Sequence, residues 1–455
     1  MPSNSRRTAY GNIAADFVVD HLASLCTPHN GIQTGPFGSQ LHQADYLPVG
    51  TPIITVEHLG DNRIIHQDIP CVSDEDKERL SKYILRKGDI VFSRVGSVDR
   101  RALVREEDGW LFSGRCLRIR PDPSKIDPHY LSYFFGLPSF QNHIRAISVG
   151  ATMPSLNTEI LSNIIVCYPG NLSEQRAIAH ILGTLDDKIE LNRQMNQTLE
   201  ALAQAIFKSW FVDFEPVRAK MEGRWRRGEL LPGLPARLWD MFPDQLVDSE
   251  MGDIPKGWKV GRLGEVLVQR VERCAASEET SAVPYVPIDC ISSNSLFLEK
   301  SKPGTEAKSS LTKFYKEDLI FGAMRPYFHK ICIAPFDGTT RTTAFVLYPK
   351  CTEGFAFATL MLSDQKSIDY ATGHSTGSTI PYASWVGSLE DMPIVVPPSN
   401  ARTALNLFAY PLLKSIPERY HENSCLTSLR DTLLPKLISG EIRIKDAEKF
   451  VEAAT

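Results

Sequence analysis

Hydrophobic residues follow a helical spacing through one long stretch near the middle of the chain. From residue 171 to 211, apolar or small residues recur every three or four positions, and Gly183 is the stretch's single glycine or proline. A heptad pattern held this long is typical of a long helix that packs against another helix. The seam consists of Ile178, Leu182, Leu185, Ile189, Asn192, Asn196, Leu199, Ala203, Ile206 and Trp210. Its two asparagines predict buried polar contacts that fix the helix register.

A second, rougher seam lies between residues 400 and 437. Its members are Ile416, Tyr420, Asn423, Leu426, Leu433 and Leu437. Pro411 and Pro417 fall in its first half, where proline removes a helical hydrogen bond and clashes with the preceding turn. We therefore expect the first half to be kinked or broken, and a shorter helix to begin near Pro417.

The remaining sequence consists of short β-branched runs separated by turn residues, with short apolar helices at 129–137 and 355–362. Runs such as DIVFSRV and CLRIRPD, and later LIFGAM and TAFVLYP, have the length and composition of strands. This pattern predicts the α+β class, with mixed α/β domains rather than an alternating βαβ array.

Several of these runs occur twice in the same order. GATMPSL at 150–156 matches GSTIPYA at 377–383, with glycine, threonine and proline each 227 positions apart. The runs at 88–94 and 317–325, at 17–22 and 258–263, and at 164–170 and 393–399 match as well. Four ordered matches predict two copies of one module, and Gly150 and Gly377 are expected to serve the backbone geometry of the repeated loop.

These patterns divide the chain into seven segments. We expect an N-terminal tail at 1–12, a first domain at 13–170 and a first long helix at 171–215. A connector at 216–257, rich in Pro, Gly and Arg, is expected to carry one short helix around 235–242. The second domain is expected at 258–398, the second long helix at 399–440 and a C-terminal tail at 441–455.

Composition narrows the class of protein. The 455 residues include 42% hydrophobic and 23% charged residues, and no apolar run is long enough to span a membrane. Nine cysteines occur singly without a CxxC pair, which favours reduced thiols in the cytoplasm and argues against a zinc site. The net charge is −4, yet eleven Lys/Arg against five acids lie at 79–120, and nine against four lie at 300–350. Two basic islands are typical of phosphate-facing surfaces, although solvated strand faces would look the same.

Catalytic motifs are missing. The sequence contains no nucleotide-triphosphate loop, no GxGxxG cradle and no Asn-Pro-Pro-Tyr signature of amino-methyltransferases. A nuclease pattern could be assembled from Pro121-Asp122 and Asp186-Asp187-Lys188, but the second element falls on the predicted long helix. We therefore expect no catalysis by this chain, no cofactor and no metal.

The chain resembles the specificity subunits of bacterial type I restriction–modification enzymes over almost its whole length. The resemblance is carried by GPFGSQL (35–41), by the run from 172 to 224 that begins LSEQRAIA, by 246–266 and by LRDTLLPKLISGEIRI (429–444). It implies two target-recognition domains, each reading half of a bipartite site in double-stranded DNA. It also implies two antiparallel helices that set the gap between the halves, two methyltransferase subunits, and restriction subunits in the full complex. PSNART at 398–403 departs from the LSEQR start of the first helix.

Polar and basic residues in loops are the candidates for DNA contact, because such side chains read base edges and bind phosphate. In the first domain they are Gln33, Thr34, Ser39, Gln40, Arg94, Ser97, Arg100 and Arg101. In the second they are Arg325, Tyr327, His329, Lys330, Ser375, Thr376 and Ser378. The alternative for each is a turn or strand-end residue that maintains the fold. Trp210, Phe211 and Phe214 are candidates for docking a methyltransferase subunit.

Three other functions stay open at this point. A stand-alone DNA-binding protein or regulator would bind its site tightly without a partner. A nuclease or transferase acting unaided would turn over substrate as the lone chain. A coiled-coil scaffold without a DNA role would leave the two basic islands unexplained, and salt-dependent retention on DNA would exclude it.

Overall fold

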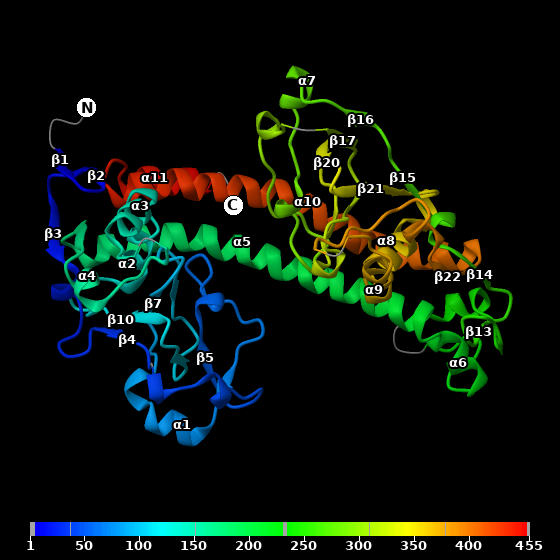
Figure 1. Cartoon of the computed structure of the whole chain (residues 1–455), viewed down its shortest axis with the longest axis horizontal. Helices are drawn as coiled ribbons and strands as arrows, with labels where there is room; N and C mark the ends of the chain where they lie inside the picture. Colours follow the sequence, from blue (N-terminus) through cyan, green and yellow to red (C-terminus); the bar gives the residue numbers. More distant parts are fainter. Residues whose placement is uncertain are drawn as a thin grey trace. The chain divides into compact units, whose positions relative to one another are not determined.

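The computed structural model describes residues 5–36, 38–150, 152–230, 234–308, 310–377 and 379–452, and these divide into two compact units (Figure 1). Unit 1 contains residues 1–188 and 426–455, and unit 2 contains residues 189–425. The chain thus enters unit 2 within its first long helix and returns to unit 1 within its last one. Within the described residues, no helix is long and apolar enough to cross a membrane.

Unit 1 is built on a four-stranded antiparallel sheet of order β4-β10-β7-β8. Its strands are β4 (Ile32–Thr34), β10 (Cys116–Ile119), β7 (Ile90–Ser93) and β8 (Arg101–Leu103). Beside it lie β3 (Phe17–His21) paired with β11 (Ile165–Pro169), and β5 (Thr51–Ile54) between β6 (Cys71–Val72) and β9 (Leu111–Phe112). The helices are α1 (Asp74–Arg79), α2 (Pro128–Phe134), α3 (Pro138–Ile147) and α4 (Thr158–Ser162).

Unit 2 repeats this plan. Its four-stranded antiparallel sheet has the order β15-β21-β18-β19, formed by Leu267–Gln269, Ala344–Pro349, Leu319–Gly322 and Ile331–Ile333. β14 (Lys259–Arg262) pairs with β22 (Pro393–Val396), and β17 (Leu311–Phe314) lies between β16 (Arg273–Cys274) and β20 (Gly338–Arg341). β12 (Leu246–Val247) pairs with β13 (Ile254–Pro255). The helices are α6 (Glu215–Met221), α7 (Glu278–Ser281), α8 (Phe355–Ser363) and α9 (Gln365–Gly373).

The strand pairings confirm that the sequence repeats encode one module twice. The matched runs at 17–22 and 258–263 form β3 and β14, and each pairs antiparallel with the strand formed by the other matched run, β11 or β22. The matched runs at 88–94 and 317–325 supply β7 and β18, which occupy the same position in their sheets. The third sheets differ, because β5 pairs with β9 in parallel whereas β16, β17 and β20 are all antiparallel.

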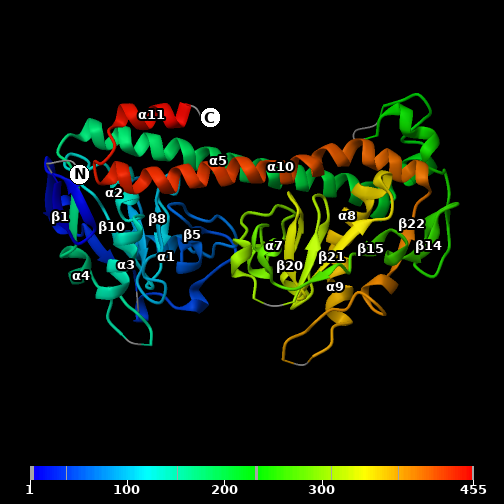
Figure 2. The ribbon, with the colours of Figure 1, turned by 90° about the horizontal axis from the view of Figure 1, so that it is seen from above.

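Two long helices carry the seams. α5 (Leu172–Phe207) has 36 residues, and the Asn171 side chain caps its start by accepting a hydrogen bond from the Ser173 amide at 2.9 Å. It runs into a π-helical turn at Lys208–Val212. α10 (Ser399–Ile438) has 40 residues and is continuous (Figure 2). Within each unit, the part of α5 and the part of α10 that belong to it contact one another through the polar residues described below.

The expectation that prolines break the second long helix is wrong. α10 continues through both Pro411 and Pro417. Leu405, Ala409, Leu413 and Ile416 on the same stretch are fully buried in the core of unit 2. Burial of this apolar face stabilises the helix against the hydrogen bonds that the two prolines remove.

The asparagines of the two seams are buried and hydrogen-bonded in unit 2, as predicted. The Asn192 amide nitrogen donates to Oδ1 of Asn423 at 2.9 Å and to Glu422 at 2.8 Å. Asn196 accepts a weaker hydrogen bond from Arg419 at 3.4 Å. In unit 1 the helices are joined by Arg430, which donates to the Asp186 carboxylate at 2.9 Å.

The termini and the connector contain more structure than expected. Residues 5–14 form a hairpin of β1 (Ser5–Thr8) and β2 (Gly11–Ala14), and Ile444–Glu452 form helix α11. The connector begins with α6 and carries a 3-10 helix at Ala236–Met241, where one short helix was predicted.

Candidate nucleic-acid interface

In unit 1 a turn that follows β7 joins the repeated glycine-containing loop. The Gly96 amide donates to the Pro154 carbonyl at 2.9 Å, and the Leu156 amide donates to the Arg94 carbonyl at 2.8 Å. The loop is closed at its base by a pair of hydrogen bonds between Val149 and Ser155. We call the turn at 94–100 together with the loop at 149–156 the first junction.

Unit 2 has the same arrangement, which we call the second junction (residues 323–330 and 376–383). The Arg325 amide donates to the Pro381 carbonyl at 2.7 Å, and the Ala383 amide donates to the Ala323 carbonyl at 2.9 Å. Thr376 and Tyr382 close the loop with two hydrogen bonds. The repeated short sequences thus encode a repeated backbone structure.

Gly150 and Gly377 serve backbone geometry, as expected. Their φ angles are +108° and +94°, a region that L side chains rarely adopt. A Cβ atom on Gly150 would lie 2.6 Å from the Met153 carbonyl oxygen, and one on Gly377 would lie 2.7 Å from the Ile380 carbonyl oxygen. Any side chain at either position would therefore distort the loop.

A buried ion pair anchors the central strand below each junction. Asp89 accepts two hydrogen bonds of 2.7 Å from Arg120, and Asp318 accepts two from Arg270 at 2.8 and 3.0 Å. Both aspartates also accept a 2.8 Å hydrogen bond from a backbone amide three residues earlier. The arginines follow different strands, β10 in unit 1 and β15 in unit 2, so the same anchor is built from different positions.

In unit 1 some of the candidate DNA contacts are exposed, and others form hydrogen bonds within the unit. Ser97 is exposed, and Gln33, Thr34 and Arg94 are half-buried, whereas the Ser39 side chain lies outside the described structure. The side-chain oxygen of Gln40 accepts a hydrogen bond from Tyr83 at 2.7 Å, and its backbone carbonyl accepts one from Arg79 at 2.6 Å, so Gln40 is bound within the unit.

The two adjacent arginines of unit 1 face inward. Arg100 donates to the Leu59 carbonyl at 2.9 Å and so fastens a neighbouring loop. Arg101 is only 4% exposed and donates to the Ser132 carbonyl at 2.8 Å. Burial lowers the pKa of its guanidinium. The structure therefore corrects the prediction for Arg101, which is a core residue and offers no surface to DNA.

In unit 2 the candidate side chains of the turn at 325–330 also differ in exposure. The Tyr327 side chain is 49% exposed, and Arg325 is half-buried. Lys330 donates to the Ile288 carbonyl at 2.8 Å, and burial lowers its pKa. Thr376 is exposed, and Ser375 donates to the Ala371 carbonyl at 2.7 Å. Ser378 lies outside the described residues.

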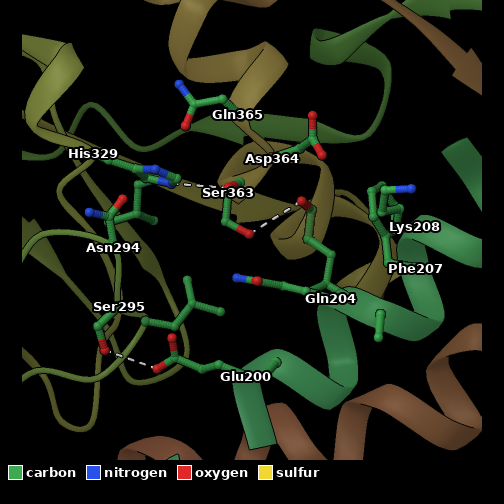
Figure 3. A pocket seen from close by; sticks show the side chains of 15 residues that line it. Glu200, Gln204, Phe207, Lys208, Asn294, Ser295, His329, Ser363, Asp364 and Gln365 are labelled. Carbon is green, nitrogen blue, oxygen red and sulfur yellow. Dashed lines mark hydrogen bonds between the residues drawn. The ribbon is translucent and has the colours of Figure 1, made fainter. Parts of the chain in front are cut away.

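His329 faces a cavity in unit 2 rather than the outer surface (Figure 3). Its Nε2 lies 3.0 Å from the Ser363 carbonyl oxygen, and burial lowers its pKa. The cavity has a volume of about 500 Å³ and is bounded by α5, the loop at 294–296, and α8 with the start of α9. This placement removes His329 from the group of exposed candidates.

Glu200 projects from α5 into the same cavity. Its carboxylate accepts a 3.0 Å hydrogen bond from the Ser295 hydroxyl (Figure 3). Burial raises the pKa of Glu200 to about 7, although hydrogen bonds from Leu296, Ser295 and Phe297 act in the opposite direction. The carboxyl group ties the long helix to a loop of the second module.

The aromatic residues predicted to dock a methyltransferase subunit lie in the core of unit 2. Trp210, Phe211 and Phe214 are all buried. The ring of Phe211 stacks on Trp258 at 5.5 Å, and Phe214 meets the same indole edge-on at 5.7 Å. These residues therefore offer no exposed aromatic surface for the predicted docking, and they join the end of α5 to the start of the second module.

Four exposed apolar residues at the junctions were missed, namely Val149, Met153, Phe328 and Ile380. Phe328 is 44% exposed next to Tyr327, and Met153 and Ile380 are exposed at equivalent positions of the two repeated loops. Met153 and Ile380 are 227 positions apart, so the sequence repeat predicts that the two residues occupy equivalent positions. Among the described residues, no cluster of three or more His, Cys, Asp or Glu side chains could hold a metal ion.

The chain is thus a two-module α+β protein with two long helices, and each module presents a turn–loop junction of the same backbone design. Residues 38–201 match the family model described as the type I restriction modification DNA specificity domain. The chain therefore resembles the specificity subunits of type I restriction–modification systems, with the family model matching residues 38–201.

The individual proteins to which the chain is similar are also specificity subunits. The chain is 29% identical to the type I restriction enzyme MjaIX specificity subunit of Methanocaldococcus jannaschii, with 97% of each chain covered. It is 25% identical to the HindI specificity subunit of Haemophilus influenzae, covering 86% of this chain and 95% of the relative. Its fold resembles the crystal structure of the S subunit of a type I restriction–modification system from M. genitalium, with a TM-score of 0.55, 16% identity, and coverage of 92% and 96%.

Proposed function

We propose that this chain is the sequence-specific DNA-binding subunit of a type I restriction–modification complex, and that each module reads one half of a bipartite site in double-stranded DNA. The observation that carries the proposal is the duplicated junction, in which one backbone design bears different exposed side chains in the two modules. A site with two different halves requires two surfaces that share a scaffold and differ in chemistry.

Buried and exposed side chains have different roles within each module. Buried pairs such as Asp89–Arg120 and Asp318–Arg270 hold the strand below the junction in place. Exposed side chains at the junctions, including Ser97, Tyr327 and Thr376, are then positioned to contact bases and phosphates, with the half-buried Arg325 beside them. The half-buried Gln33, Thr34 and Arg94 are retained as candidates beside them.

Partners are the second part of the proposal. Two methyltransferase subunits would dock on equivalent surfaces of the duplicated chain, and restriction subunits would join through them in the cytoplasm. The specificity subunits named above support this assignment by their type I restriction enzyme membership. Since Trp210, Phe211 and Phe214 are buried, we propose that the docking surface involves other, exposed residues.

Methylation mapping in cells tests the function directly. Cells that carry this chain with its methyltransferase subunit are expected to contain methylated adenines in one bipartite sequence. Cells that lack only this chain are expected to lose those methyl groups. An unchanged methylation map after removal of the chain would contradict the proposal.

A further inference from the structure

The two junctions share their backbone but differ at the tip of the turn. The Arg100 amide donates to the Ser97 carbonyl at 3.1 Å in unit 1, and the His329 amide donates to the Pro326 carbonyl at 2.8 Å in unit 2. These equivalent hydrogen bonds each enclose two residues. Val98 and Asp99 in the first module thus correspond to Tyr327 and Phe328 in the second.

The enclosed residues have opposite chemistry. Val98 is 1% exposed, and the Asp99 carboxylate is held by Arg145 at 2.6 Å. The first tip is therefore closed and its charge is paired. The rings of Tyr327 and Phe328 are exposed and lie 4.8 Å apart at an angle of 54°. The second tip presents two adjacent aromatic rings to solvent.

The backbone that presents these rings is in an unfavourable conformation. Arg325 and His329, on either side of the tip, have φ angles of +52° and +50°. Non-glycine residues rarely adopt this region, and such strained backbone gathers at functional sites. Gly96 occupies the position of Arg325 in the first module with φ +83°. The second module therefore places a guanidinium where glycine would fit without strain.

Arg325 adds a cation two positions before the aromatic pair in the sequence. No hydrogen bond or ion pair within the described residues engages its half-buried guanidinium. An unpaired guanidinium beside exposed rings is suited to a ligand that combines phosphate with flat aromatic surface. DNA has both features, and every base has a face on which an aromatic side chain can stack.

We propose that Tyr327 and Phe328 form an aromatic tip that stacks on, or inserts between, bases of the half-site read by the second module, with Arg325 on the adjacent phosphate. This inference rests on the proposed function. Backbone common to both modules cannot distinguish two half-sites, so discrimination must come from exposed groups that differ. Among the described residues of the two junction turns, the aromatic tip is the exposed difference with the largest apolar surface.

The test measures DNA binding by the full chain in complex with its methyltransferase subunit. The probes are a duplex with the sequence found methylated in cells and an unrelated duplex of equal length, both followed by fluorescence anisotropy. The variants are Tyr327→Ala/Phe328→Ala, the ring-preserving Phe328→Tyr, and Val386→Ala as a control at a highly exposed apolar residue of the same unit. Thermal melting of each complex verifies folding.

The double alanine variant is expected to bind the methylated sequence at least tenfold more weakly, since one lost stacking contact costs roughly 1–3 kcal/mol. Its binding to the unrelated duplex should stay within twofold, and Phe328→Tyr and Val386→Ala should resemble the wild type. Target binding of the double variant within twofold of the wild type would overturn the inference while leaving the proposed function standing. Loss of the methyltransferase subunit on purification would overturn it in favour of a protein-docking tip. A wild-type complex without preference for the methylated sequence would refute the proposed function itself.

Discussion

At the scale of single residues, the buried aspartates explain why the repeated strand is so similar in both modules. Asp318 is nearly inaccessible, and its carboxylate satisfies both Arg270 and the Tyr315 amide. Arg270 also lies 4.6 Å from the ring centroids of Tyr315 and Tyr348. Removing the carboxylate leaves a partly buried cation and a backbone donor without their partner.

Asp318→Ala is therefore expected to lower the free energy of unfolding by about 3 kcal/mol. Asp391→Ala is the matched control, because Asp391 forms an ion pair of 2.7 Å with Arg262 that is exposed on both sides. Its loss should cost less than about 1 kcal/mol. Urea denaturation of the three proteins measures both effects, and equal losses would show that the buried pair is not an anchor.

Glu200 predicts a pH dependence of stability. Its pKa is raised from 4.5 to about 7 in the folded chain, so the folded state binds the proton more tightly than the unfolded state. The stability that this group contributes is present below about pH 4.5 and is lost as the pH rises to about 7. His329, Lys208 and Asp364 line the same cavity, and a substitution of Glu200 leaves all three in place.

Glu200→Gln is accordingly expected to raise the free energy of unfolding by about 1–3 kcal/mol at pH 8 and to change it little at pH 5. Glu353→Gln, at an exposed position of the same unit, should change it little at either pH. Thermal unfolding at the two pH values is the measurement. A stabilisation of the same size at both would contradict the assignment to an ionised buried carboxylate.

At the scale of elements, the long helices combine an apolar face with a few buried polar contacts. The Asn192–Asn423 hydrogen bond joins α5 to α10 within unit 2. Buried asparagines between helices fix register at a cost in stability. Replacing Asn423 removes one of the two hydrogen-bond acceptors of Asn192, whereas replacing both asparagines removes the pair.

Asn423→Leu alone is expected to destabilise the chain by about 1–3 kcal/mol, and Asn192→Leu/Asn423→Leu to recover most of that loss. The two single variants, the double variant and the wild type form a complete double-mutant cycle in urea. If the double variant loses as much stability as the two single variants together, the two asparagines do not interact.

The helices also show where prediction from sequence succeeds and where it fails. The heptad spacing located α5 and the buried asparagines, because side-chain periodicity reflects which face is covered. Proline chemistry suggested a break near Pro417, yet α10 is continuous. Local preferences for Pro411 and Pro417 are outweighed by the burial of residues such as Leu413 and Ile416, and that burial depends on contacts distant in sequence.

The candidate site was predicted less completely than the fold. Sequence placed Arg101 and Tyr327 in the same class of loop residues, although one is buried and the other is half-exposed. Residue type gives no indication of side-chain direction at a strand end, so the inward arginine could not be foreseen. Trp210 and Phe211 looked like a docking patch for the same reason, because their partners Phe242 and Trp258 lie beyond the helix.

At the scale of the whole molecule, duplication is the feature that links sequence to function. Two modules with the same strand order carry the same junction, and their exposed side chains differ. Under the proposed function, a single polypeptide holds two reading surfaces, and we expect their specificities to vary independently.

Exchanging one module tests whether the two modules determine their half-sites independently. The measurement is the map of methylated adenines in cells whose chain carries the second module, residues 258–398, from the Haemophilus influenzae HindI relative. The account predicts that one half of the methylated sequence changes and the other half stays as in cells with the unaltered chain. A map in which both halves change, or in which neither half changes while methylation persists, would contradict it.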